Sequence, residues 1–356
     1  MIEEGKVAFN AEGAFYNPKM KLNRDISLSV VRALGISEYL DALAASGVRG
    51  MRVAKETHAE KVILNDVSRT ACALIQENLK LNHIGNCEVC CSNANVLLHQ
   101  RRFQTVDLDP FGSPAPFLAA GARSASSYLF ITATDTAPLC GAHLKSGIRK
   151  YMAVPVKTEY HREMGARILL GAVARELARI DKSMVPFLTF VVDHYVRIFV
   201  EVRRGAGLAD KTLENIGYLE HCTNCGSWKS RLGMNCKSCN KCTNCGGKTR
   251  VAGPLWLGAI QNRDLIDLAL KELISVAGNT DREFRLLHLC RDEIDEPMYR
   301  DHHKLCKSLG VTPGPIDGVI GALISEGWNA SRTHFSGVGI KTNAPLEALQ
   351  GVLHRA

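Results

Sequence analysis

One stretch near the middle of the chain, Asp107 to Pro114 (DLDPFGSP), constrains the fold more than any other part of the sequence. The residues before it, Phe103 to Leu108, alternate apolar and polar side chains at the period of a β-strand, and Pro110 cannot continue a hydrogen-bonded ladder. The turn therefore falls at the carboxyl end of a strand, which is the edge where open α/β sheets bind ligands. We expect Asp109, Pro110 and Phe111 to face a cleft.

These three residues suit chemistry on an exocyclic amino group. The Asp109 carboxylate and the Pro110 carbonyl can each accept one N–H, while the Phe111 ring holds a planar base by stacking. An ordinary proline turn would contain the same residues, because Asp and Pro are favoured in turns. The motif alone leaves both interpretations open, so the rest of the chain has to separate them.

Strands and helices alternate through the first 205 residues, which predicts a mostly parallel sheet covered by helices. The predicted strands are one that begins near Tyr39, then Lys61 to Asp66, Cys87 to Cys91, Phe103 to Leu108, Tyr128 to Thr134, and a closing hairpin from Pro186 to Arg203. The predicted helices are Ser27 to Leu34, one from about Met51, one capped by Ser68, Pro116 to Ser124, and His161 to Ile180. His194, at the tip of the hairpin, is expected to be a turn or surface residue.

A glycine turn and an acid indicate a nucleoside cofactor. Gly47 and Gly50 let the backbone approach a ligand at a helix N-terminus, although their spacing does not meet the three-glycine dinucleotide fingerprint. Arg49, between them, can pair with the carboxylate of an amino-acid moiety. Asp66, at the end of the following strand, can accept both hydroxyls of a ribose. A generic α/β turn with a helix cap would show the same residues.

Two further segments carry candidate binding residues. Residues Glu12 to Asp25 read as a loop, in which Phe15 and Tyr16 beside cations form a possible stacking platform for a base. The alternative is that Phe15 covers a domain edge. Asn93-Ala94-Asn95 follows the Cys87 to Cys91 strand, where an amide can reach an adenine edge, and turn chemistry would also explain the two asparagines.

Composition places the protein among soluble globular proteins. The chain has 356 residues, of which 46% are hydrophobic, and a formal charge of +8 that permits, but does not require, a nucleic-acid partner. Its N-terminus has neither a basic n-region nor an apolar h-region, and no apolar run approaches the ~18 residues that a membrane span needs. We expect a cytoplasmic protein without a membrane partner. Its oligomeric state does not follow from the sequence.

Six of the 13 cysteines lie between Cys222 and Cys245 in a segment with little apolar content. Such a segment cannot bury a core, so a tetrahedral Zn²⁺ is the physical reason it could fold, and four thiolates would leave that zinc no open position for catalysis. Matching Cys-Gly knuckles favour the ligand set Cys222, Cys225, Cys242 and Cys245. Cys236 and Cys239 are the alternative ligands.

The C-terminal part has its own pattern. Beyond Pro254 the sequence has helical periodicity through about Cys306, followed by a predicted helix from Pro315 to Glu326 and a strand-like segment from Ala330 to Lys341. This order is typical of a helix followed by a wing. We expect the wing to display Arg332, His334, Phe335 and Lys341, either for RNA binding or as a solvated basic edge.

Several short motifs, spread over nearly the whole chain, together carry a family resemblance. They are Phe15-Tyr16-Asn17-Pro18-Lys19-Met20, Leu22-Asn23-Arg24-Asp25, Leu40-Asp41-Ala42-Leu43, Gly47-Val48-Arg49-Gly50, Asn65-Asp66, Asp107 to Pro114, Thr132-Ala133-Thr134-Asp135, Ala137 to Ala142, Gly253-Pro254-Leu255-Trp256 and Arg332-Thr333-His334-Phe335. With these motifs the chain resembles the tRNA (guanine-26) N2-dimethyltransferases, of the archaeal and eukaryotic type.

The resemblance implies an α/β fold with a Rossmann-like class I methyltransferase sheet, a C-terminal α+β domain containing a zinc-binding segment, and S-adenosyl-L-methionine as cofactor. The implied cofactor-binding residues are Arg24 and Arg49 for the methionine end, Asp66 for the ribose, Asn93 and Ala94 for the adenine, with Asp41 and Gly47 beside them. The implied catalytic residues are Asp109 and Pro110, which orient the guanine amino group, and Phe15 and Phe111, which sandwich the base. Asn93 departs from the Asp usual in the family, and the cysteine cluster has extra members.

The implied activity is transfer of methyl groups to N2 of guanine-26 in tRNA, giving first N2-methyl- and then N2,N2-dimethylguanosine. The expected domains are a substrate loop region at 1–26, the methyltransferase domain at 27–205, the zinc segment at 206–255 and a winged-helix-like tRNA-binding region at 256–356. Two alternatives remain open. One is an amino-group methyltransferase acting on another nucleic acid or on protein glutamine, and the other is a non-enzymatic zinc-containing RNA-binding protein.

Overall fold

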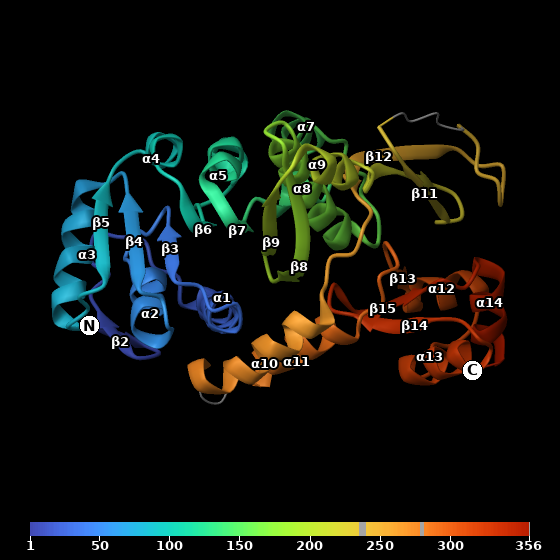
Figure 1. Ribbon diagram of the computed structural model, residues 1–356. Helices are drawn as coiled ribbons and strands as arrows, with labels where there is room; N and C mark the ends of the chain where they lie inside the picture. The colour runs from blue at the N-terminus through green and yellow to red at the C-terminus, as the bar shows by residue number, and fades with distance from the viewer. Residues whose placement is uncertain (235–239, 278–280, 356) are drawn as a thin grey trace.

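A seven-stranded sheet organises the first 204 residues of the protein, seen at the left and centre of the computed structural model in Figure 1. The structure describes residues 1–234, 240–277 and 281–355. The strand order is β5-β4-β3-β6-β7-β9-β8, in which the first five strands pair in parallel and the last two pair antiparallel. The strands are β3 (Glu38–Asp41), β4 (Lys61–Asp66), β5 (Cys87–Cys91), β6 (Phe103–Leu108), β7 (Ala125–Ala133), β8 (Lys182–Val192) and β9 (Tyr195–Arg204). The predicted fold class is confirmed.

Helices cover both faces of this sheet and define two apolar cores. One core contains residues of α4 (Ala94–Gln100), α5 (Leu118–Ser124) and α8 (His161–Ala178), together with one face of the strands. The other contains residues of α1 (Lys21–Ala33), α2 (Val48–Glu56) and α3 (Arg69–Leu81). Shorter elements lie at the edges, namely β1 (Ile2–Glu4), β2 (Val7–Phe9), η1 (Pro18–Met20), η2 (Ala115–Phe117), α6 (Thr136–Leu139) and α7 (Leu144–Tyr151).

The predicted strands and hairpin agree with the structure to within a few residues, but the first helix does not. Helix α1 begins at Lys21, inside the segment that we predicted to be a loop. The reason is that Arg24 and Asp25 are buried in ion pairs with Glu4 and Arg52, at 2.5 and 2.7 Å. Charged residues that are buried as pairs do not follow the apolar period, so the first turn of α1 could not be recognised from it.

The cysteine segment forms a small antiparallel sheet after α9 (Ala206–Leu213). Its strands are β10 (Ile216–Cys222), β11 (Trp228–Leu232) and β12 (Thr249–Trp256), in the order β11-β10-β12. Strand β12 packs closely on α8, because a Cβ atom added at Gly171 would lie 3.1 Å from the Cα of Leu255. This sheet is therefore attached to the seven-stranded sheet through α8.

Two helices, α10 (Arg263–Ala277) and α11 (Asp281–Asp292), run beneath the large sheet and share the core of α1. The remaining chain forms a separate small core from α12 (His302–Leu309), α13 (Ile316–Ser325), α14 (Leu346–Arg355) and a sheet of β13 (Arg300–Asp301), β15 (Ser336–Thr342) and β14 (Ala330–Thr333). The predicted order of a helix followed by a β-hairpin is present. The domain limits given above stay a prediction.

The predicted display of wing residues is wrong for three of the four. Lys341 is 1% exposed and lies 2.9 Å from carboxylate oxygens of both Glu163 and Glu293. The His334 ring is buried against Glu293, and Phe335 is buried as well. Arg332 alone reaches the surface, where it pairs with Asp317. A buried carboxylate cluster draws these residues inward, and that cluster has no local signature in the sequence.

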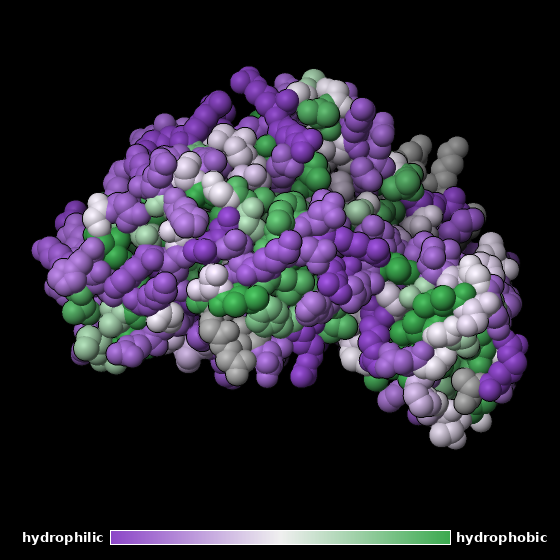
Figure 2. Space-filling view, turned by 60° about the horizontal axis from the view of Figure 1, so that its bottom comes forward, coloured by the Kyte–Doolittle hydropathy of each residue, from purple (hydrophilic) through white to green (hydrophobic). Residues whose placement is uncertain are grey.

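Figure 2 shows the face that includes α10 and α11, with the C-terminal domain protruding at the right. Most of this face is hydrophilic, and the apolar residues on it form scattered patches. Within the described part of the chain, no helix has both the length and the apolar character needed to cross a membrane.

Candidate active site

A cavity of about 530 Å³ opens where β3, β4 and β6 end. Asp41, Asp66 and Asp109 come from these three strand ends and all line the cavity. Parallel strands place their carboxyl ends at one edge of the sheet, so three acids far apart in the sequence meet there. The cavity volume lies in the range of roughly 300–1,000 Å³ that holds organic ligands of cofactor size.

The glycine turn after β3 forms one wall. Gly47 has a φ of +79° and precedes α2, and a Cβ atom there would lie 3.0 Å from a side-chain carbon of Ile75. Residues on either side of it, Ser46 and Val48, line the cavity. A side chain at this position would therefore strain the backbone and push on the core. Backbone N–H groups of the turn lie at the start of α2, where the helix dipole favours a negative group.

Asp66 holds this turn in place from the neighbouring strand. Its Oδ2 accepts a hydrogen bond from the Ala45 N–H at 2.9 Å, and its Oδ1 accepts one from the Ser68 N–H at 2.9 Å. Each carboxylate oxygen keeps capacity for a second donor. The acid can therefore position the turn and accept ligand hydroxyls at once.

Asp109 is held by an arginine from the glycine turn. Its Oδ2 accepts a hydrogen bond from Arg49, whose other terminal nitrogen donates to Ser27 Oγ at 3.0 Å and Asn23 Oδ1 at 3.2 Å. Arg49 is 5% exposed, so its charge is largely removed from water. A buried guanidinium needs acidic partners, and Arg49 lines the same cavity as the carboxylate that it holds.

A second buried pair lies behind the first. Arg197 on β9 donates to both carboxylate oxygens of Asp107, at 2.7 and 2.6 Å, and Tyr39 donates to the same carboxylate. Burial opposes ionisation of Asp107, but the Arg197 and Arg49 guanidinium groups outweigh it and lower its pKa. Asp107 therefore carries a fixed negative charge beneath the motif turn.

Asp41 is the exception among these acids. It is fully buried, and burial raises its pKa to about 7, although Arg49 and a hydrogen bond from the Gly50 N–H act in the opposite direction. Nearby Asp107 and Asp109 add to the rise because like charges disfavour a third carboxylate. Asp41 can therefore gain or lose a proton near neutral pH at the floor of the cavity.

The motif turn is fastened to the end of β7. The Gly112 N–H donates to Thr134 Oγ1 at 2.8 Å, and the Thr134 N–H donates to the Gly112 carbonyl at 2.9 Å. This leaves Phe111 exposed, with its ring 5.3 Å from that of Phe15 at an angle of 69°. The two predicted base-binding rings, 96 positions apart in sequence, thus meet edge to face at the mouth of the cavity.

Arg24 also lines the cavity, but its guanidinium is bound from behind. It donates to both oxygens of Glu4, at 2.6 Å and 2.5 Å, and lies 5.2 Å from the centre of the Tyr16 ring. Burial raises the pKa of Glu4, but Arg24, Arg52 and a hydrogen bond from Tyr16 outweigh it and lower that pKa to about 2. Glu4 therefore stays ionised and fixes Arg24 in the wall.

Two predicted cofactor residues are not part of this wall. Asn93 caps α4, accepting a hydrogen bond from the Asn95 N–H at 2.9 Å, and is exposed. Neither Asn93 nor Ala94 is among the residues that line the cavity. Their predicted contact with an adenine stays a prediction.

Two residues that hold the site together, Glu4 and Arg197, have no role predicted from the sequence. Glu4 lies in a three-residue strand without any motif, so nothing pointed to it. Arg197 could have been found, because a cation in the middle of the apolar run Tyr195–Arg204 is unusual in a buried strand and implies a buried acid as partner.

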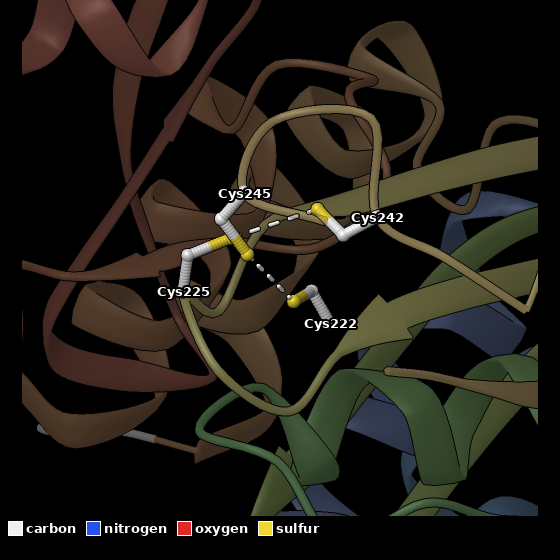
Figure 3. A group of neighbouring side chains, drawn as sticks. All are labelled: Cys222, Cys225, Cys242 and Cys245. Carbon is white, nitrogen blue, oxygen red and sulfur yellow. Dashed lines mark hydrogen bonds between the residues drawn. The ribbon is translucent and has the colours of Figure 1, made fainter. Parts of the chain in front are cut away.

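The four predicted zinc ligands converge outside this cavity, as Figure 3 shows. Their Sγ atoms all lie within 4.8 Å of one another, with 3.5 Å between Cys222 and Cys245 and 3.7 Å between Cys225 and Cys242. Sulfur atoms in a tetrahedron of 2.3 Å zinc bonds are ~3.8 Å apart, whereas a disulfide needs about 2.05 Å. The group can hold a metal ion. Cys236 and Cys239, the alternative ligands, lie outside the described residues.

Known proteins resemble this chain over nearly its full length. The family model for N2,N2-dimethylguanosine tRNA methyltransferases matches residues 1–354. A tRNA (guanine(26)-N(2))-dimethyltransferase from Methanosarcina mazei is 47% identical over 97% of this chain and 92% of its own length. A protein of the same name from Methanosphaerula palustris is 44% identical over 95% of this chain and 91% of its own length.

A solved structure has the same fold. Trm1 from Pyrococcus horikoshii, in complex with S-adenosyl-L-methionine, matches 99% of this chain and 99% of its own, with a TM-score of 0.91 and 37% identity. The likeness therefore extends from the large sheet through the cysteine segment to the C-terminal domain. On the extent of these matches, the chain belongs to the N2,N2-dimethylguanosine tRNA methyltransferase family.

Proposed function

We propose that this protein transfers methyl groups from S-adenosyl-L-methionine to N2 of guanine-26 in tRNA, the activity that its relatives' names state. The observation that carries the proposal is the placement of Asp109 and Pro110 at the end of β6, beneath two aromatic rings and beside Arg49. This arrangement offers two hydrogen-bond acceptors and a stacking site to one planar amino-bearing base.

The cavity fits the cofactor. Asp66 has capacity for the two ribose hydroxyls, Arg49 and Arg24 supply cations for an amino-acid carboxylate, and the glycine turn supplies backbone at a helix N-terminus. When bound, S-adenosylmethionine supplies an electrophilic methyl group on a sulfonium centre. Asp107 stays ionised behind the cavity, and its negative charge complements that positive centre.

Asp109 prepares the nucleophile. The lone pair of guanine N2 is delocalised into the ring, so N2 is a poor nucleophile until its two hydrogens are held. Asp109 accepts one hydrogen and the Pro110 carbonyl the other, which turns the lone pair toward the methyl donor. As the N–C bond forms, N2 becomes cationic, and Asp109 is positioned to take the proton that it releases.

Arg49 positions Asp109 for the base. Its guanidinium binds Oδ2 of Asp109 and holds the carboxylate in place, and the carboxylate keeps acceptor capacity for the guanine amino group. We infer that Arg49 can hold Asp109 and still offer charge to the cofactor carboxylate, because a guanidinium has five N–H donors.

The second methyl needs a second encounter. After one transfer N2 keeps a single hydrogen, so only one of the two acceptors can hold it and the methylamine must rotate before reacting again. We propose two separate transfers, each with fresh cofactor. The monomethylated nucleoside should therefore appear first and then decline.

The cysteine group is proposed as a structural zinc site, because four thiols at tetrahedral spacing leave no open position. The described cysteines are free thiols rather than disulfides. Thiols suit a reducing compartment, and with tRNA as the substrate we infer a cytoplasmic location.

The decisive experiment is methyl transfer by the Asp109→Asn variant. Labelled cofactor is incubated with bulk tRNA, DNA or protein, and the products are digested to nucleosides or amino acids. The wild type should label N2 of guanosine in tRNA. Asp109→Asn should lower that rate by ~10²-fold or more, because a positioned proton acceptor is lost, with cofactor affinity nearly unchanged.

Asp210→Asn is the matched control, since this acid is exposed on α9 and does not line the cavity. It should keep full activity. Label in DNA or protein alone would contradict the substrate assignment, and full activity of Asp109→Asn would remove that residue from the mechanism. A wild type that binds tRNA without transferring any methyl would instead favour a non-enzymatic binding protein.

A further inference from the structure

A second cavity, of about 250 Å³, adjoins the active-site cavity. The two share Asp193 and His194, the residues at the turn between β8 and β9. The second cavity extends from this turn to the N-terminus of α8 and to the segment around α6. Any group that leaves the active-site cavity across the β8–β9 turn would therefore enter it.

The wall of this second cavity is cationic. Lys157, His161 and Arg162 line it, and both Lys157 and Arg162 are exposed. Within the described ranges, neither of these two cations forms an ion pair with a carboxylate. Arg49 and Arg197 beside the active-site cavity, in contrast, form buried ion pairs with acids. Lys157 and Arg162 therefore bring two unpaired positive charges to one hollow.

Acidic groups in the same wall do not cancel this charge. Asp193 is already bound by Arg282, which donates to its two oxygens at 3.2 and 3.0 Å. Burial raises the pKa of the Cys140 thiol to about 11, so Cys140 is neutral at physiological pH. Helix α8, of 18 residues, begins at His161 and directs the positive end of its dipole toward the cavity.

We propose that this second cavity binds a phosphodiester group of the RNA that flanks the target guanosine. The inference rests on the proposed function, because a base inserted between Phe15 and Phe111 carries its own ribose and phosphates with it. A base that is turned out of its stack must be held by contacts to its backbone, since those contacts fix position. Lys157 and Arg162 supply the charge, and the imidazole of His194, which lines both cavities, offers a further N–H donor. The ring of His161 is engaged, because its Nδ1 donates to the Thr158 carbonyl at 2.9 Å.

The test combines variants of the protein with a modified substrate. Lys157→Gln and Arg162→Gln, singly and together, are compared with Lys145→Gln, which alters an exposed lysine of α7 outside the cavity. The double variant should raise KM for tRNA several-fold and reduce the slope of log binding constant against log salt by about 1, because one phosphate is no longer neutralised. Cofactor affinity should not change.

Two modified tRNA substrates locate the contact. Each has one neutral methylphosphonate linkage, which lies on the 5′ side of guanosine-26 in one substrate and on the 3′ side in the other. Wild type should lose affinity for one of the two substrates, whereas the double variant should bind both as it binds unmodified tRNA. Equal losses in wild type and double variant, or behaviour of the variants like Lys145→Gln, would overturn the phosphate site. A wild type that does not methylate tRNA at all would overturn the proposed function instead, so the two failures are distinct.

Discussion

At the scale of single residues, Asp41 makes the stability of the protein depend on pH. Its pKa is raised by burial to about 7 in the folded state, against an ordinary value of 3.8. Between pH 3.8 and about 7 the folded chain keeps a proton on Asp41 that the unfolded chain releases. The stabilisation from this proton is therefore fully present below pH 3.8 and is lost as pH rises through about 7. The free energy of unfolding should fall by at most about 1.4 kcal/mol per pH unit from this group.

Asp41→Asn should remove that slope, because the amide does not titrate. Urea unfolding of both proteins at pH 5, 6, 7 and 8 checks it. The wild type should lose stability relative to the variant as the pH rises. Parallel curves for the two proteins would show that Asp41 does not take up the proton.

Also at the scale of single residues, a substitution of Phe15 tests base binding independently of cofactor binding. It is 56% exposed and touches Phe111, so its removal should change folding stability by only ~0.5 kcal/mol. Stacking of a base on one ring contributes about 1–3 kcal/mol, so Phe15→Ala should slow tRNA methylation roughly 10-fold or more. Single-turnover rates with saturating cofactor measure this.

Met152→Ala is the control, because Met152 is 70% exposed and does not line the active-site cavity. It should methylate tRNA at the wild-type rate. If Phe15→Ala instead weakens cofactor binding as strongly as it slows transfer, Phe15 supports the cofactor rather than the base.

At the scale of elements, the small sheet β11-β10-β12 should depend on metal. Purified protein should contain one equivalent of zinc, and Cys225→Ser should lose most of it, because three thiolates and a hydroxyl bind zinc less tightly. Cys91→Ser, which alters an exposed thiol of β5, should keep its zinc. Metal analysis after gel filtration gives the counts.

Loss of zinc should expose the cysteine segment to protease while cofactor affinity persists, since the four thiols lie outside the active-site cavity. Limited proteolysis of Cys225→Ser, with cleavage sites mapped by mass, tests this. The structural role of zinc would be contradicted if wild-type protein stripped of metal resisted protease as well as the zinc-loaded form does.

The elements also show how far the sequence predicts the structure. Strands such as Lys61–Asp66 and Cys87–Cys91 were predicted with their observed limits, because β-period and turn residues are local signals. Helix α1 was predicted to begin six residues too late, and Lys341 was expected at the surface. Both errors involve charges that are buried against acids distant in the sequence, and no local pattern records such a partner.

The residues of the candidate site also fall into two groups, those that local sequence signals predict and those that they do not. Asp66, Asp109 and the glycine turn could be predicted because strand ends of a parallel sheet share one edge. The pairing of Arg49 with Asp109 could not, since two oppositely charged residues 60 positions apart reveal contact only in three dimensions. The same holds for Glu4 behind Arg24.

At the scale of the whole molecule, a buried ion cluster joins the methyltransferase sheet to the C-terminal domain. Lys341 on β15 lies between Glu163 on α8 and Glu293 after α11, and Glu163 also accepts from Arg167 at 2.8 Å. Lys341→Met would leave two buried carboxylates short of a cation, at a cost of about 3–5 kcal/mol in the free energy of unfolding.

Denaturant unfolding of Lys341→Met and of Lys307→Met, which changes an exposed lysine of α12, provides the comparison. The Lys307 variant should differ from wild type by less than ~0.5 kcal/mol. Equal stability of the two variants would mean that the carboxylates are satisfied without Lys341.

This ion cluster also fixes a distance. Because its charges are shielded from water, the C-terminal domain cannot turn on α8 without leaving carboxylates unpaired in an apolar surrounding. The cluster therefore keeps the C-terminal domain at a constant distance from the mouth formed by Phe15 and Phe111. Any single molecule that contacts both must span that distance.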